Sequence, residues 1–221
     1  MLKIQNLSNC AVFFDFDNTI TTVDVLDEVI RRYSINGDWI RYESLWKDGK
    51  IGSKECTEAQ LKGIRVNKET LDRYLATVKL DVSFVKLLAL LKRYNIHPVI
   101  LSDSFTYFVH TILKNHNIRN LPVYANTIRF EGQRLIPSFP YRNSECKRCA
   151  HCKGAHLIKP SISDKATIHI GDGLSDVCAA LAADIVFAKE KLVDYLKKEK
   201  KACLEFVHLK DVYDLFKKAQ T

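Results

Sequence analysis

The sequence predicts an α/β fold in which helices cover both faces of a parallel sheet, and two observations carry that prediction. First, apolar runs too short for helices recur along the chain, at residues 10–16, 98–101, 167–170, 184–188 and 204–207. Second, segments with helical periodicity alternate with these runs, at residues 82–94, 105–115 and 176–183. Strands that alternate with helices favour a parallel sheet.

Two segments depart from this alternation. Residues 21–81 contain no convincing strand and are most clearly helical at 24–33 and 70–78, so we expect a helical cap inserted after the first strand. Residues 1–20 and 82–221 would then form the core. Within the core, two β-prone runs at 123–139 flank Glu131-Gly132 and predict a β-hairpin.

Composition and charge exclude several classes of protein. With 47% hydrophobic and 27% charged residues, the chain is not a wholly disordered one. No run approaches the ~20 apolar residues of a membrane span, and a signal peptide is not visible, so we expect a cytoplasmic protein without a membrane partner. The seven cysteines, an odd number, fit a reducing compartment.

The net charge of +8 raises the question of a nucleic-acid partner. No nucleic-acid-binding motif accompanies the basic residues, so we expect none. A basic chain also attracts anionic phosphate substrates, which is compatible with the site described next. The sequence gives no indication of the oligomeric state.

Polar side chains follow three of the apolar runs, where ligands bind in open parallel sheets. Buried carboxylates there need compensation, and their oxygens suit Mg²⁺. The alternative for Asp15 and Asp17 is that they are strand-end acids that cap a helix. The residues that follow the three runs are Asp15 and Asp17, then Ser102, Asp103 and Ser104, then Gly171, Asp172, Gly173 and Asp176.

Four ordered elements resemble the motifs of haloacid dehalogenase superfamily phosphatases. They are D-F-D-N-T (Asp15 to Thr19), L-S-D-S (Leu101 to Ser104), Lys153, and G-D-G-L-S-D (Gly171 to Asp176). The resemblance implies a Rossmann-like, doubly wound parallel sheet. The long gap between the first two motifs is similar to the helical cap of the phosphoserine phosphatase-like branch, subfamily IB. The D-x-D form is typical of phosphatases rather than dehalogenases.

The resemblance implies a magnesium-dependent phosphomonoesterase that forms an aspartyl-phosphate. Asp15 would be the nucleophile and Asp17 the general acid and base. Ser102 would hydrogen-bond a phosphoryl oxygen and Lys153 would neutralise its charge. The expected magnesium ligands are Asp15, Asp172 and the backbone carbonyl of Asp17. Asp176 would orient Lys153 or a metal-bound water. The other supporting residues are Thr19, Gly171 and Gly173.

A narrower likeness concerns the substrate, which we expect to be a small-molecule phosphate. Ser144 to Gly154, S-E-C-K-R-C-A-H-C-K-G, resembles the cysteine-rich stretch of two groups. They are the 2-hydroxy-3-keto-5-methylthiopentenyl-1-phosphate phosphatases of methionine salvage and the phosphoethanolamine/phosphocholine phosphatases. Phosphoserine is the alternative substrate, although S-D-S replaces the usual S-G-G. Asp103 would meet a cationic ammonium group or cap a helix, and Asp24 lies near the position of a substrate-binding Glu.

Other residues and functional classes are weighed against these. Cys146, Cys149 and Cys152 have spacing compatible with structural zinc, but only one of two usual knuckles is visible, so a reduced loop supporting Lys153 is favoured. Four histidines are expected to pack rather than catalyse: His97, His110, His116 and His169. A phospho-acceptor signalling domain, a basic nucleic-acid-binding protein and a phosphotransferase with an acceptor other than water stay open as alternatives.

Overall fold

The computed structural model describes residues 9–219 of the chain. Internal contacts divide these residues into two units. Unit 1 comprises residues 9–22, 79–101 and 153–219, and unit 2 comprises residues 23–78 and 102–152. Each unit is therefore assembled from segments that are far apart in the sequence.

Unit 1 contains a parallel sheet. Its strands are β1 (Cys10–Phe14), the first residues of β2 (Val99–Phe105), β5 (Ala166–Gly171), β6 (Ile185–Ala188) and β7 (Leu204–Glu205). Parallel pairings give the order β2-β1-β5-β6-β7, with Phe14 opposite Ile100 on one side and Ile170 on the other. β1 is made entirely of apolar residues, Cys-Ala-Val-Phe-Phe, as a strand buried on both faces requires. All five predicted strands are confirmed, and β2 runs four residues beyond its predicted end at residue 101.

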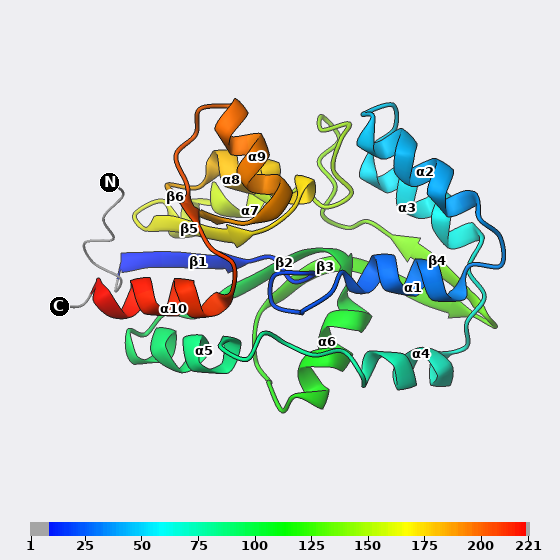
Figure 1. The fold of residues 1–221 in the computed structure, drawn as a ribbon, viewed down its shortest axis with the longest axis horizontal. Helices are drawn as coiled ribbons and strands as arrows, with labels where there is room; N and C mark the ends of the chain where they lie inside the picture. Colours follow the sequence, from blue (N-terminus) through cyan, green and yellow to red (C-terminus); the bar gives the residue numbers. More distant parts are fainter. Residues whose placement is uncertain (1–8, 220–221) are drawn as a thin grey trace. The chain divides into compact units, whose positions relative to one another are not determined.

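Helices flank this sheet on both sides. In Figure 1, α5 (Phe84–Arg93) and α10 (Leu209–Lys218) lie on one side of β1, and α8 (Val177–Ala182) and α9 (Glu190–Lys198) lie on the other. The short helix α7 (Gly154–Leu157) and the 3-10 turns η2 (Pro160–Ile162) and η3 (Leu174–Asp176) complete unit 1. The predicted α/β fold with a doubly wound sheet is confirmed.

Unit 2 contains the other α-helices of residues 9–219 and a hairpin. The helices are α1 (Val25–Tyr33), α2 (Asp38–Lys47), α3 (Ser53–Lys62), α4 (Lys68–Leu75) and α6 (Thr106–Asn115). Strands β3 (Val123–Glu131) and β4 (Arg134–Ser138) pair antiparallel beside the end of β2. Gly132 has a φ of 59° at the turn, a conformation that glycine adopts without steric cost. The predicted hairpin is therefore confirmed.

Backbone hydrogen bonds join the hairpin, and the loop that follows it, to the segment of unit 2 that contains α3 and α4. The Val66 amide donates to the Gln133 carbonyl at 2.8 Å. Further along, the Ser53 amide donates to the Arg148 carbonyl, also at 2.8 Å. The hairpin that we expected in the core thus shares a unit with the helices of the predicted cap, and a separate cap at residues 21–81 stays a prediction.

Local signals account for the helix boundaries. Asp24 caps α1 by accepting a hydrogen bond from the Asp27 amide at 2.9 Å, and Asn67 caps α4 by accepting one from the Thr70 amide at the same distance. The cap at Asn67 makes α4 begin two residues before the predicted start at residue 70. None of the helices in residues 9–219 is long and apolar enough to span a lipid bilayer.

Candidate active site

Acidic residues gather at the carboxyl edge of the unit 1 sheet. Asp15 follows β1, and its amide donates to the Ile170 carbonyl at 2.8 Å, so the pairing of β1 with β5 continues to the first acid. Asp172 follows β5 directly. Carboxylate oxygens of Asp15, Asp172 and Asp176 lie within 4.8 Å of one another. The parallel pairing of β1 and β5 thus brings acids from distant parts of the chain together.

Lys153 lies among these acids with no exposed surface. Its Nζ atom contacts Asp15 Oδ1 and donates to Asp176 Oδ1 at 2.8 Å. The next residue, Gly154, opens α7 so close to α8 that an added Cβ would stand 2.7 Å from the Cys178 carbonyl oxygen. Glycine at position 154 therefore allows the close packing of α7 that carries the lysine into the site.

Asp176 is the most strongly held acid of the group. Its Oδ2 atom accepts hydrogen bonds from the amides of Asp172 and Gly173, both at 3.1 Å. Its Oδ1 atom lies 3.0 Å from His169 Nε2 as well as close to Lys153. The carboxylate thereby fixes the turn that follows β5.

These contacts shift the pKa values of Asp15, Asp172 and Asp176 in different directions. Burial raises the pKa of Asp15 well above its usual range, the negative charge of Asp176 raises it further, and Lys153 offsets only part of this. Burial and Asp176 also raise the pKa of Asp172. Burial alone would raise the pKa of Asp176, but Lys153 and the hydrogen bond from His169 outweigh it and hold that pKa below its usual range.

The D-F-D-N-T loop orients Asp172. Asn18, in the left-handed region with a φ of 53°, donates from Nδ2 to Asp172 Oδ2 and to Glu190 Oε2, both at 3.0 Å. Thr19 Oγ1 donates to Asp172 Oδ1 at 3.1 Å. Asp17, half-buried, lies in the same loop. Sequence reasoning gave no role to Asn18 or Glu190; the tolerance of asparagine for positive φ was the available signal for Asn18, and Glu190 offered none.

This donor set fits a magnesium ion. Three carboxylates face one ammonium group, which leaves two formal negative charges uncompensated in a buried place. The available ligand atoms are hard carboxylate oxygens, which Mg²⁺ prefers over nitrogen or sulfur. A bound divalent cation would balance the negative charge that Lys153 does not compensate.

Comparison with known proteins shows the family of the chain. A family model described as "Putative Phosphatase" matches residues 10–193. The chain belongs to this family of haloacid dehalogenase superfamily phosphatases. It is accordingly a hydrolase of phosphoric monoesters, and the predicted enzyme class is confirmed.

Relatives of this phosphatase are named for one substrate. This chain is 25% identical over 204 residues to the 2-hydroxy-3-keto-5-methylthiopentenyl-1-phosphate phosphatase of Bacillus cereus (strain B4264), and the match covers 91% of this chain and 93% of the relative. The protein of the same name from Brevibacillus brevis is 24% identical over 213 residues, covering 95% and 96%.

Solved structures support the fold of the phosphatase. A substrate-bound phosphoserine phosphatase superimposes with a TM-score of 0.72 at 17% identity, covering 92% of this chain and 96% of that chain. Phosphoserine phosphatase from T. onnurineus gives a TM-score of 0.70 at 18% identity, covering 98% of both chains. At these identities the likeness confirms the fold.

The remaining predicted site residues of the phosphatase belong to unit 2. Ser102 is buried and its Oγ accepts a hydrogen bond from the Ser104 amide at 3.0 Å. Asp103 Oδ1 accepts from the His151 amide at 3.1 Å. Asp103 is not a helix cap, because the N-cap of α6 is Phe105 and that helix has no side-chain cap. Asp24 is exposed and caps α1.

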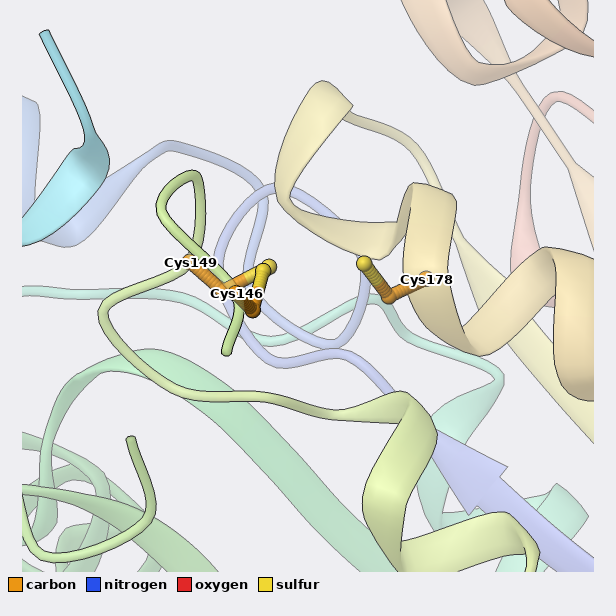
Figure 2. Close-up of side chains that lie close together, drawn as sticks. All are labelled: Cys146, Cys149 and Cys178. Carbon is orange, nitrogen blue, oxygen red and sulfur yellow. The ribbon is translucent and has the colours of Figure 1, made fainter. Parts of the chain in front are cut away.

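The cysteine-rich loop provides few metal ligands within unit 2. Figure 2 shows the sulfur atoms of Cys146 and Cys149 next to each other on this loop, and both belong to unit 2, whereas Cys178, labelled in the same picture, belongs to unit 1. Among the described residues, Cys152 does not join Cys146 and Cys149 in a group of ligand atoms within 4.8 Å. Two thiols are fewer than the four ligands of a structural zinc site, so the three-cysteine zinc site is not supported.

His156, on α7 beside Lys153, makes the stability of the phosphatase depend on pH. Burial lowers the pKa of His156 to about 4, and the Lys159 ammonium, 3.1 Å from Nδ1, contributes. In the unfolded chain the pKa of His156 has its ordinary value of ~6.5. As pH falls from ~6.5 to ~4, His156 is therefore protonated in the unfolded chain but stays neutral in the folded chain. The contribution of His156 to stability is therefore present above pH ~6.5 and lost on acidification.

We predict that His156→Gln flattens the loss of unfolding free energy between pH 7 and pH 4.5, because the residue that favours the unfolded chain in acid is gone. Urea titrations at both pH values measure this. The exposed His110→Gln serves as the matched control and keeps the wild-type slope. Equal slopes for His156→Gln and wild type would contradict the prediction.

Proposed function

We propose that this phosphatase hydrolyses a small-molecule phosphate monoester through an aspartyl-phosphate on Asp15, with Mg²⁺ as its cofactor. The supporting observation is the buried Lys153 ammonium held against Asp15 and Asp176. It supplies a fixed positive charge beside a carboxylate at the sheet edge where ligands bind. Catalysis of phosphoryl transfer depends mainly on such positioning and charge stabilisation.

In the proposed first step, an Asp15 oxygen attacks phosphorus and the bond to the leaving oxygen breaks. Asp17 gives its proton to that oxygen, so the alcohol leaves neutral. In the second step, Asp17 takes a proton from water, whose oxygen attacks phosphorus and releases inorganic phosphate and the Asp15 carboxylate. Lys153 neutralises charge on the phosphoryl oxygens, and by family resemblance Ser102 donates a hydrogen bond to one of them.

The proposed magnesium ligands are Asp15, Asp172 and the backbone carbonyl of Asp17. Asn18 and Thr19 hold both oxygens of Asp172, which restricts the rotation of that carboxylate. When bound, the cation offsets negative charge on the phosphoryl group. Asp176 has a different role in this proposal, because its oxygens already accept four hydrogen bonds.

We propose 2-hydroxy-3-keto-5-methylthiopentenyl-1-phosphate as the first substrate to test. Two relatives with this activity in their names match more than 90% of the chain. Amino-alcohol phosphates come second, on the likeness of the Ser102-Asp103-Ser104 motif to the phosphoethanolamine/phosphocholine group. Phosphoserine is the alternative. A cytoplasmic location stays a prediction from the sequence.

The nucleophile is tested by Asp15→Asn, which we expect to abolish turnover of p-nitrophenyl phosphate because the amide is a poor nucleophile and binds the cation weakly. Wild-type activity is expected to vanish in EDTA and to return with added Mg²⁺. The control is Asp194→Asn, an exposed acid on α9, which keeps wild-type kcat. Activity in Asp15→Asn, or activity insensitive to EDTA, would refute the mechanism.

A substrate panel tests the proposed specificity and separates an enzyme from a phospho-acceptor domain. We expect repeated turnover, with kcat/KM for the methylthiopentenyl substrate at least ~10-fold above that for phosphoserine, a difference of about 1.4 kcal/mol in transition-state binding. Phosphoethanolamine and phosphocholine complete the panel. A preference for phosphoserine would overturn the substrate assignment. A single burst of phosphate release without repeated turnover would indicate a phospho-acceptor domain instead of an enzyme.

A further inference from the structure

His169 is a fully buried histidine that the proposed steps leave unused. It lies in the middle of β5, opposite Phe13 of β1 and Val186 of β6. The strand is otherwise made of apolar and small residues there, so a histidine is costly unless its polar atoms find partners. What His169 contacts therefore decides why the chain carries it.

Gly171 leaves the space that lets His169 reach the site. Side chains at 169 and 171 point to the same face of the strand, because alternate residues do so. A Cβ at Gly171 would stand 2.6 Å from Asp176 Cγ and 2.9 Å from His169 Nε2. Glycine at 171 thus permits the contact between the histidine and the acid across that position.

The contact itself fixes the protonation of the ring. His169 Nε2 is 3.0 Å from Asp176 Oδ1, and this same oxygen accepts from Lys153 Nζ at 2.8 Å. His169 Nδ1 is buried without a hydrogen-bond partner among residues 9–219. A carboxylate oxygen accepts, so Nε2 carries the proton, and a proton on Nδ1 would be a buried donor without an acceptor.

We propose that His169 is a positioning residue, a neutral Nε2–H donor that fixes the Asp176 carboxylate so that Asp176 holds Lys153 against Asp15. This inference rests on the proposed function, because it assigns Lys153 its catalytic charge. Backbone amides already hold Asp176 Oδ2, so the hydrogen bond from His169 completes the fixation at the other oxygen. A fixed ammonium stabilises developing phosphoryl charge better than one that shifts with its acceptor.

The test compares two variants with opposite chemistry. His169→Leu removes the donor and is expected to lower kcat by about 10- to 100-fold with KM changed less than about 3-fold. His169→Gln keeps an N–H near the position of Nε2 and is expected to recover most of kcat. The control is Ile168→Val, a buried neighbour on the opposite face of β5, which keeps kcat within about 2-fold.

A spectroscopic readout accompanies the kinetics. ¹⁵N NMR of the His169 ring at neutral pH is expected to show a protonated Nε2 and a bare Nδ1. It can be recorded on the wild-type protein, so it decides the tautomer even where His169→Leu does not fold. A protonated Nδ1, or a kcat of folded His169→Leu equal to the wild-type value, would overturn the proposal. So would a folded His169→Gln as impaired as His169→Leu.

The outcome is separable from that for the proposed function. Loss of activity in Asp15→Asn with full activity in His169→Leu rejects the positioning role alone. Retained activity in Asp15→Asn rejects the proposed function itself.

Discussion

The rest of the site depends on the ion pairs of the buried Lys153 ammonium with Asp15 and Asp176. A lysine without exposed surface is costly to fold unless its charge is paired and hydrogen-bonded, and here two carboxylates share it. Through it, α7 is connected to the end of β1 and to η3. Removing the ammonium would leave Asp15 and Asp176 as buried like charges beside each other, so the charge that the proposed mechanism uses is also a folding constraint.

The same arrangement divides the acids into different roles. Asp176 accepts four hydrogen bonds, which stabilise its charged form, and its pKa is lowered accordingly. It therefore stays charged and holds Lys153 in place. Asp15 keeps a strongly raised pKa, because one ammonium shared with Asp176 does not offset its burial. In the proposed mechanism, a carboxylate left undercompensated in this way would attract a further cation and would then react with a phosphoryl group.

The sequence predicted much of the fold and the acids of the site for physical reasons. Parallel strands place their carboxyl ends at one edge, so the positions of Asp15 and Asp172 directly after two apolar runs predicted that they lie near each other. Lys153, one of 34 lysines and arginines, stood out only through its motif. The contacts of Asn18 and Glu190 were missed, because local spacing does not reveal which distant side chains meet. His169 was expected to pack and is indeed buried, but its hydrogen bond to Asp176 was not foreseen. The grouping of the hairpin with the helices rests on contacts between distant segments, such as the hydrogen bond from Val66 to Gln133, that no local pattern encodes.

Calorimetric titration of the wild-type protein with Mg²⁺ tests whether the buried acids outnumber the ammonium by the charge of one divalent cation. We expect one magnesium site per chain, with affinity lowered at least ~10-fold in Asp172→Asn. Affinity should be unchanged in the exposed control Asp194→Asn. A wild-type protein that binds no Mg²⁺, or an Asp172→Asn variant that binds it equally well, would show that these acids do not form a magnesium site.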